Sequence, residues 1–237
     1  MARRKISQYV ARFIFRTVCF LLIATVVGII AWRILSSGVP TEMKTLVGNE
    51  KLSAAYNENG GNLNIFYQGD LDNITRTEYN SGYFSVHNVA FIDEAEQLQV
   101  VVRHNKSTLE NLKEDLKLPE ADSRDEDVFD IQITVMYDLT PENKADNDGN
   151  TPSAVKKVTY RASESTSMQK NLYNYKKYVV DGIKITDDVI AVYVDIFYDK
   201  DVMSEGTLCI YDYRYPRDEY KLTNKDLAEI SRLNIEF

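Results

Sequence analysis

A long apolar run near the N-terminus constrains this chain more than any other feature. Residues 17–32 contain no charged side chain, and Arg16 and Arg33 stand at the two ends of that run. As a helix, the 23 residues 13–35 would extend about 35 Å at ~1.5 Å per residue. Because the hydrocarbon core of a bilayer is only ~30 Å thick, the sequence predicts a transmembrane helix over residues 13–35. The lipid bilayer is therefore the first expected partner.

The charge distribution predicts which way this helix crosses the membrane. Residues 1–16 hold five basic side chains and no acidic one, and residues 1–40 carry a net charge of +6. The whole chain carries −8, which leaves −14 for residues 41–237. Because basic residues that flank a span are retained inside the cell, we expect residues 1–12 to be a cytoplasmic tail and the C-terminal part to be extracellular. A domain at −14 lacks the basic footprint of nucleic-acid binding, so no nucleic-acid partner is expected.

A cleaved signal peptide is the alternative to an uncleaved signal anchor. Signal peptides have an apolar region of about 7–15 residues before a small-x-small cleavage site, and Ser36-Ser37-Gly38 offers such a site. The apolar run of this chain is longer, and Trp32-Arg33 is the kind of pair found at membrane interfaces. These two features favour an uncleaved anchor.

The two cysteines bear on the compartment of the outer part. Cys19 lies within the expected membrane span and Cys209 near the far end of the outer part, so the two are not expected to pair. A secreted animal domain of this size more often carries disulfides. The pattern therefore favours a protein of the bacterial cell envelope.

The outer part is predicted to consist of a stalk and one domain. Residues 36–61 contain Pro40 and Gly60-Gly61, with only short apolar pieces between their turn-forming residues. Residues 62–237 are enough for one domain with a sizeable core. We therefore expect a linker over residues 36–61 and a folded domain over residues 62–237.

Several segments of this domain alternate apolar and polar residues with a period of two. Residues 128–137, 97–103 and 189–198 each place a row of apolar side chains on one face and polar side chains on the other. Such alternation is typical of antiparallel sheets with one buried face. Further strands are expected at residues 63–68, 83–92, 155–161, 172–180 and 207–213.

Two short helices are expected beside these strands. Ser107-Thr108-Leu109-Glu110 is a capping box before leucines at helical spacing, and Pro119 ends that pattern. Near the C-terminus, Thr223 can cap a second helix with Asp226 three residues on. Eight strands with turn-rich links predict an antiparallel β-sandwich of immunoglobulin-like type, with two short accessory helices. The chain is thus expected to be mainly β after its N-terminal helix.

One set of residues suggests cysteine chemistry. Cys209 lies in a predicted strand, with His104 upstream and Arg214 and Arg217 downstream. This outline resembles the sortases, which have a basic N-terminus, one anchor helix and an outer β-barrel of similar length. The resemblance implies Cys209 as nucleophile, His104 as base and Arg214 or Arg217 as stabilising cation. Sortases carry this cysteine in a Thr-Leu-x-Thr-Cys motif, whereas Thr207-Leu208-Cys209 lacks the two intervening positions. A sortase-like transpeptidase or hydrolase is therefore the alternative, and a small buried cysteine is the favoured interpretation.

Metal and aromatic sites have simpler explanations. Residues 146–150 resemble the acidic turn of a calcium loop, but positions one and twelve would be Lys144 and Val155, so a polar hairpin loop is expected. The acidic run at residues 120–130 is expected to be a solvated loop. Two tyrosine pairs share strand faces, and structural packing is favoured over an exposed binding stripe. The pairs are Tyr173 with Tyr175 and Tyr211 with Tyr213.

These observations predict a membrane-anchored, extracytoplasmic binding or structural module of the cell envelope that acts by contact and not by chemistry. Among the 237 residues we find no phosphate loop, dinucleotide fingerprint or paired-histidine metal motif. No catalytic, cofactor-binding or metal-binding residue is therefore assigned. The expected partner of the outer domain is an envelope protein or a cell-wall polymer, and the sequence does not name it.

Overall fold

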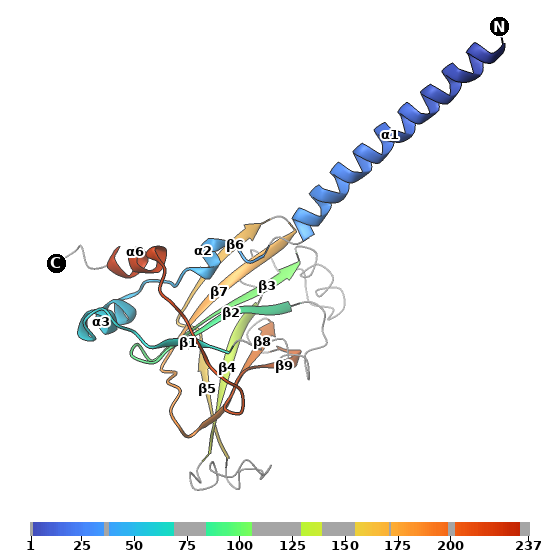
Figure 1. The fold of residues 1–237 in the computed structure, drawn as a ribbon. Coiled ribbons are helices and arrows are strands. Elements are labelled where there is room, and N and C mark those ends of the chain that lie inside the picture. Colours follow the sequence, from blue (N-terminus) through green and yellow to red (C-terminus); the bar gives the residue numbers. More distant parts are fainter. Residues whose placement is uncertain are drawn as a thin grey trace, which may run out of the picture. The chain divides into compact units, whose positions relative to one another are not determined.

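The computed structural model describes residues 2–35, 38–68, 84–105, 129–138, 155–170, 172–198 and 202–232. The chain divides into two compact units, Met1–Pro40 and Thr41–Phe237, which are described separately (Figure 1).

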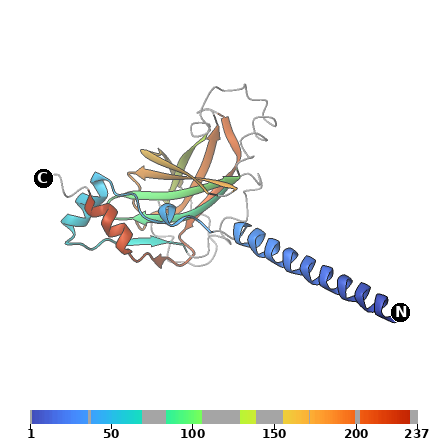
Figure 2. The same ribbon diagram turned by 90° about the horizontal axis from the view of Figure 1, so that it is seen from above.

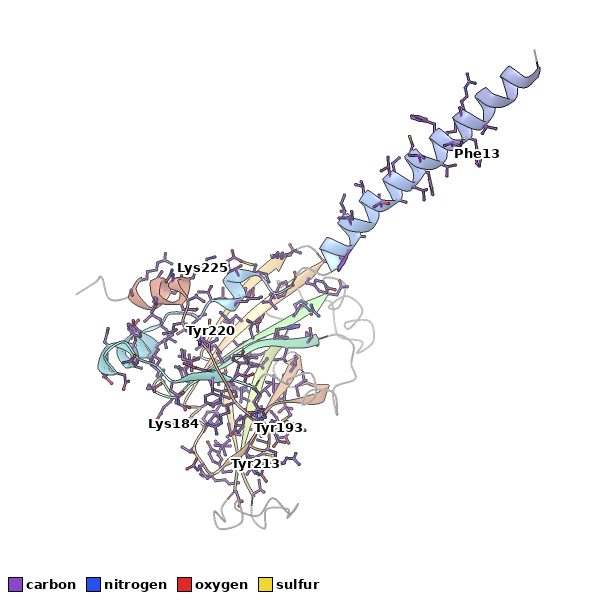
Figure 3. The ribbon with its side chains drawn as sticks, viewed as in Figure 1. Phe13, Lys184, Tyr193, Tyr213, Tyr220 and Lys225 are labelled. Atoms are coloured by element: carbon purple, nitrogen blue, oxygen red, sulfur yellow. The ribbon has the colours of Figure 1, made fainter. Side chains whose placement is uncertain are left out.

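The first unit is one helix, α1 (Ala2–Leu35), which begins well before the expected span. Its segment Val10–Trp32 has a mean hydropathy of 2.5 and is long and apolar enough to cross a membrane. The side chain of Phe13, which Figure 3 labels on this helix, is 72% exposed. The hydroxyl of Thr25 donates to the carbonyl of Leu21 at 2.8 Å, so this polar group is satisfied within the helix. An apolar surface with internally paired polar groups is what a bilayer requires of a helix.

The second unit is mainly β and contains two antiparallel sheets. The large sheet has six strands in the order β10-β1-β2-β3-β7-β6, and the small sheet has four in the order β5-β4-β8-β9. The strands are β1 (Ile65–Tyr67), β2 (Phe84–Ile92), β3 (Gln97–Asn105), β4 (Phe129–Asp138), β5 (Val155–Arg161), β6 (Glu164–Lys170), β7 (Tyr173–Asp181), β8 (Val189–Tyr198), β9 (Val202–Asp212) and β10 (Asp218–Glu219).

The facing sides of the two sheets share one hydrophobic cluster, the main core. In the small sheet, Ile133 of β4 lies opposite Val194 of β8, and both are completely buried. In the large sheet, Leu98 and Val100 of β3 belong to the same cluster. The alternation in the sequence therefore places the apolar face of each sheet against the other.

The opposite face of the large sheet is covered as well. Ala90 and Ile92 of β2 alternate with Phe91 of the main core and belong to a second hydrophobic cluster. This second cluster includes Leu52 of α3 (Glu50–Glu58) and Ile230 of α6 (Asn224–Arg232). Figures 1 and 2 show the two helices beside one another at one end of the domain. Both faces of the large sheet are thus buried over part of their area.

The secondary structure confirms much of what the sequence predicts. Each of the eight expected strands is present, and β6 and β10 are additional. The C-terminal helix α6 begins after Thr223, whose hydroxyl accepts a hydrogen bond from the Asp226 amide at 3.3 Å, as the capping pattern predicts. The helix expected after Ser107 lies outside the described residues.

Residues 36–61 differ from the expected linker. They contain two helices, α2 (Thr41–Lys44) and α3, and the compact unit begins at Thr41. The reason is burial, because Met43 and Leu46 are at most 3% exposed and Leu52 is completely buried. The apolar side chains of Met43, Leu46 and Leu52 therefore pack onto the domain and belong to its folded part.

Candidate functional site

A cavity of about 530 Å³ lies on the face of the large sheet that carries Ala90 and Gln99, opposite its main-core face. Segments from distant parts of the sequence meet there: α2 and the residues after it, β1, β2, β3, β7 and the chain from β10 towards α6. We call it the lysine pocket, after Lys44, Lys177 and Lys221. Its lining residues are Lys44, Leu46, Tyr67, Gln68, Asn88, Val89, Ala90, Gln99, Lys177, Glu219, Tyr220 and Lys221.

A bulge in β2 forms one wall of the lysine pocket. The pairing of β2 with β3 shifts between His87 and Ala90, and Asn88 has a φ of 48°. Asparagine tolerates this left-handed conformation better than most residues, and such bulges re-aim the side chains around them. On its other side, β1 pairs with β2 only near Phe91, while Tyr67 of β1 pairs with Asp218 of β10. The bulge and the divergence of β1 together open space beside the sheet.

Three buried polar side chains hold residues 45–47 against the outer face of the large sheet. Lys177 of β7 donates to the carbonyl of Thr45. The amide of Gln99 in β3 donates to the Val47 carbonyl at 2.9 Å and accepts from the Val47 N–H at 2.8 Å. The carboxylate of Asp226 in α6 accepts from the N–H of Leu46 at 2.7 Å. We call this set of hydrogen bonds the clasp.

The clasp also requires close backbone packing against α6. A Cβ atom at Gly48 would collide with the backbone carbonyl oxygen of Glu229, so glycine is needed there. The hydroxyl of Tyr220, just before α6 (Figure 3), donates to the carboxylate of Asp226 at 3.0 Å, and the Lys44 carbonyl lies 3.4 Å from the same hydroxyl. The segment that carries Lys44 is therefore fixed on the domain by backbone contacts as well as by side chains.

Burial changes the acid–base behaviour of two groups at this site. Lys177 is 3% exposed, and burial lowers the pKa of its ammonium group to about 8, although Asp226 and Glu229 act in the opposite direction. Burial, with a further contribution from Asp226, raises the pKa of the Tyr220 hydroxyl. The tyrosine therefore stays a neutral hydrogen-bond donor at neutral pH.

The lysine pocket carries an excess of positive charge. Its lining contains three lysines and one acidic side chain, Glu219. Lys44 and Lys221 are exposed. Within the described ranges, the ion pairs shorter than 4 Å involve Lys51, Arg214 and Arg232, and none involves a pocket lysine. The positive charge of the pocket therefore has no carboxylate partner in direct contact among these residues.

The structure does not bring the cysteine and histidine of the sortase-like set together. Cys209 of β9 lies between Leu208 and Ile210, which both belong to the main core, so its side chain points to the other face of the small sheet. Its thiol donates to the Tyr211 carbonyl at 3.3 Å. His104 belongs to β3 of the large sheet, where its ring lies 5.7 Å from that of Phe84. The two residues therefore lie in different sheets and on faces that do not meet.

The remaining members of this set have local partners. Arg214 forms a bidentate pair with Asp212, with distances of 2.6 and 3.0 Å, and this contact raises the pKa of the guanidinium group. Arg217 donates to the Tyr211 hydroxyl at 2.6 Å and lies over the Phe66 ring at 4.8 Å. Both arginines follow β9 and contact its last residues, and Arg217 also contacts Phe66 of β1 in the large sheet.

His87, the other histidine of the second unit, lies in the large sheet. Its Nε2 is 2.9 Å from the hydroxyl of Ser85, and Arg103 donates to that same hydroxyl at 3.1 Å. Among the described residues, no group of three or more histidine, cysteine, aspartate or glutamate side chains is placed to hold a metal ion. Residues 146–150 and most of the acidic run lie outside the described ranges.

The tyrosine pairs do not form exposed stripes. Tyr175 is 1% exposed, and its ring contacts that of Tyr173 edge-on at 6.5 Å. The guanidinium group of Arg103 covers the Tyr173 ring at 4.6 Å. Tyr211 is buried in the main core, while Tyr213 is 44% exposed. These aromatic residues therefore serve mainly in packing.

Sequence reasoning missed the residues of the lysine pocket. The signal was present in β7, where Lys176 and Lys177 interrupt a run of aromatic and apolar residues. In β3, Gln97 and Gln99 alternate with main-core residues, and this pattern predicts a solvent-facing side. Both glutamines are completely buried, because the clasp and the second cluster cover that side.

Comparison with protein families and with curated proteins finds no family model and no protein that matches this sequence. The site must therefore be interpreted from its own geometry and chemistry.

Proposed function

We propose that this chain is a single-pass membrane protein that holds an immunoglobulin-like domain outside the cell and acts by binding a component of the cell envelope. The observation that carries the proposal is the lysine pocket, which collects three lysines from α2, β7 and the segment after β10. Ligand sites are concave and mostly apolar, with a few convergent polar groups. The lysine pocket is concave and brings several polar groups together. Cys209 and His104 of the sortase-like set lie in different sheets and form no such site.

The strand order supports the immunoglobulin-like assignment. If β2, β3, β4, β5, β6, β7, β8 and β9 are lettered A, B, C, C′, D, E, F and G, the sheets read A-B-E-D and C′-C-F-G. This is the order of immunoglobulin domains, in which one sheet is ABED and the other contains CFG. All neighbouring strands are antiparallel, as that topology requires. The strands β1 and β10 then extend the A-B-E-D sheet and carry part of the pocket.

The length of the tether supports a partner close to the membrane. Helix α1 ends at Leu35 and the second unit begins at Thr41. The five residues between them span at most about 18 Å when fully extended. A stalk of 26 residues, as expected from the sequence, would reach several times further. The reach of the domain is therefore short, which suits an envelope protein or the membrane-proximal part of a cell-wall polymer.

The charge distribution supports the orientation. Residues 1–40 carry +6 and the remaining residues carry −14. Basic flanks are retained in the cytoplasm, and long domains cross regardless of their own charge. Protease added to intact cells should therefore digest the domain and spare the N-terminal tail. A mature N-terminus at Val39, found by mass spectrometry, would contradict the uncleaved anchor.

The binding function itself is tested by cross-linking in living cells. A photoreactive phenylalanine at Glu219 lies on the rim of the lysine pocket, and the same residue at Lys184 serves as the control, because Lys184 is exposed and does not line the pocket. We expect a discrete envelope adduct from position 219 and none from position 184. Equal adducts from both positions, or none from either, would refute an envelope partner at this pocket.

A further inference from the structure

The lysine pocket combines unpaired positive charge with an apolar wall, and this combination restricts its ligand. We propose that it binds a phosphate ester with a small organic group, such as a glycerol phosphate unit. This inference rests on the proposed binding function and names the chemical class of its ligand. The cations come from three separate elements, Lys44 of α2, Lys177 of β7 and Lys221 after β10.

The number of cations in the pocket favours phosphate over carboxylate. All three basic residues that line the pocket are lysines, and none is an arginine. Arginine presents a planar fork that matches carboxylates and phosphates alike, whereas lysine is a compact point charge with three donors, so several lysines can approach the oxygens of one tetrahedral phosphate from different directions. Lys177 directs a hydrogen bond to Thr45, and an ammonium group has two further N–H donors. Three such groups can neutralise the single charge of a phosphate diester or the two charges of a phosphate monoester.

The remaining lining residues fit the organic part of such a ligand. Leu46, Val89 and Ala90 supply apolar residues to the lining, and Tyr67 and Asn88 supply residues with polar groups. The volume of about 530 Å³ lies within the ~300–1,000 Å³ typical of small-molecule sites. A bare phosphate would leave most of this space unfilled, whereas a phosphate with a glycerol or a similar group would occupy more of it.

The net charge of the domain makes local attraction decisive. Residues 41–237 carry −14, so an anion gains nothing from the field of the whole domain. Binding of a phosphate must therefore come from the three pocket lysines at close range. Affinity should fall with added salt, because the exposed Lys44 and Lys221 are screened by ions.

The test uses the full chain, purified in a maltoside detergent and a phosphate-free buffer. Glycerol 3-phosphate is titrated by calorimetry against the unaltered protein and the double variant Lys44→Gln/Lys221→Gln. Both side chains are exposed, so the variant should keep its fold. The matched control is Lys184→Gln/Lys225→Gln, which removes the same charge from two exposed lysines outside the pocket (Figure 3). We expect the pocket variant to bind about tenfold more weakly and the control to bind within about twofold of the unaltered protein.

A second arm distinguishes the source of the phosphate ester. The same proteins are placed in maltoside micelles that contain either phosphatidylglycerol or uncharged diacylglycerol, and the exposed lysines are labelled with an acylating reagent. Protection of Lys44 and Lys221 by phosphatidylglycerol alone identifies a lipid head group. Binding of free glycerol 3-phosphate without such protection identifies a soluble or polymer-borne ester.

The proposal is overturned if neither arm detects binding, or if the control variant loses as much affinity as the pocket variant. Both arms use purified protein and do not depend on the orientation in the cell. If both arms fail, the phosphate ligand is refuted. The proposed contact with an envelope component is then still tested by cross-linking. An adduct missing in cells, with glycerol 3-phosphate bound in vitro, would instead refute the proposed partner and leave the phosphate site.

Discussion

Replacement of Asp226 by alanine is expected to destabilise the domain by about 3–5 kcal/mol. Asp226 is completely buried and accepts four hydrogen bonds with its two carboxylate oxygens. One comes from the N–H of Leu46 in the clasp at 2.7 Å, and one from the hydroxyl of Tyr220 at 3.0 Å. The other two come from the N–H and the hydroxyl of Thr223, at 2.8 and 2.6 Å.

The magnitude follows from the partners that the variant leaves behind. The N–H of Leu46 would lose its acceptor in a buried place, at about 1–3 kcal/mol. The hydroxyl of Tyr220 is partly buried and would lose its shorter hydrogen bond, at about 1 kcal/mol. The capping arrangement of Thr223 at the start of α6 would be weakened by about 1 kcal/mol. Entry of water into the space left by the side chain offsets part of this cost.

The assay is urea unfolding of the full chain in maltoside micelles, followed by far-UV circular dichroism. Fluorescence is unsuitable, because the single tryptophan, Trp32, lies in α1 and does not report on the domain. The control is Asp187→Ala, an exposed aspartate whose removal should change the free energy of unfolding by less than about 0.5 kcal/mol. A loss below about 1 kcal/mol for Asp226→Ala would refute the structural role assigned to the clasp.

Three further predictions use the same unfolding assay. Burial lowers the pKa of Lys177 from 10.5 to about 8, so between these values the unfolded chain holds a proton that the folded chain has released. The free energy of unfolding of the unaltered protein, relative to that of Lys177→Met, should therefore rise between pH 8 and pH 10, by at most about 1.4 kcal/mol per pH unit. If the difference between the two proteins stayed constant over this range, the assigned burial of Lys177 would be contradicted. Ile133→Ala should cost about 2–4 kcal/mol, because Ile133 is completely buried opposite Val194, and a cost below about 1 kcal/mol would argue against its core position. Cys209→Ala should change stability by less than about 1 kcal/mol and leave glycerol 3-phosphate binding unchanged, because Cys209 is only partly buried and lies outside the lysine pocket; loss of binding in this variant would revive the cysteine chemistry.

The two sheets were largely predictable from the sequence, because their inner faces follow a strict period of two. Ile131, Ile133 and Val135 of β4 are buried in one row, and the matching row of β8 lies opposite. Strand β6 was not predictable in this way, since it is an edge strand with mostly exposed polar residues and no apolar face. Its position follows from pairing with β7, which no pattern within β6 reveals.

The lysine pocket could not be predicted, because its parts come together only in three dimensions. The Leu46 N–H is 180 positions from its acceptor Asp226, and the Thr45 carbonyl is 132 positions from Lys177. Local patterns carry no information on such contacts. The segment of residues 36–61 has few apolar residues, and they become buried only because α6 and the outer face of the large sheet lie beneath them.

The clasp and the lysine pocket share residues. Docking of residues 44–46 onto the domain is therefore linked to ligand binding in the pocket. Lys177 holds the Thr45 carbonyl and also lines the pocket, and Tyr220 contacts both Asp226 and the pocket. A ligand that binds only when residues 44–46 are docked stabilises the docked state by about 2.7 kcal/mol at 100 times its dissociation constant. That is comparable to the cost of losing one or two hydrogen bonds of the clasp. The segment that joins the domain to α1 is therefore the segment that ligand binding would hold most firmly.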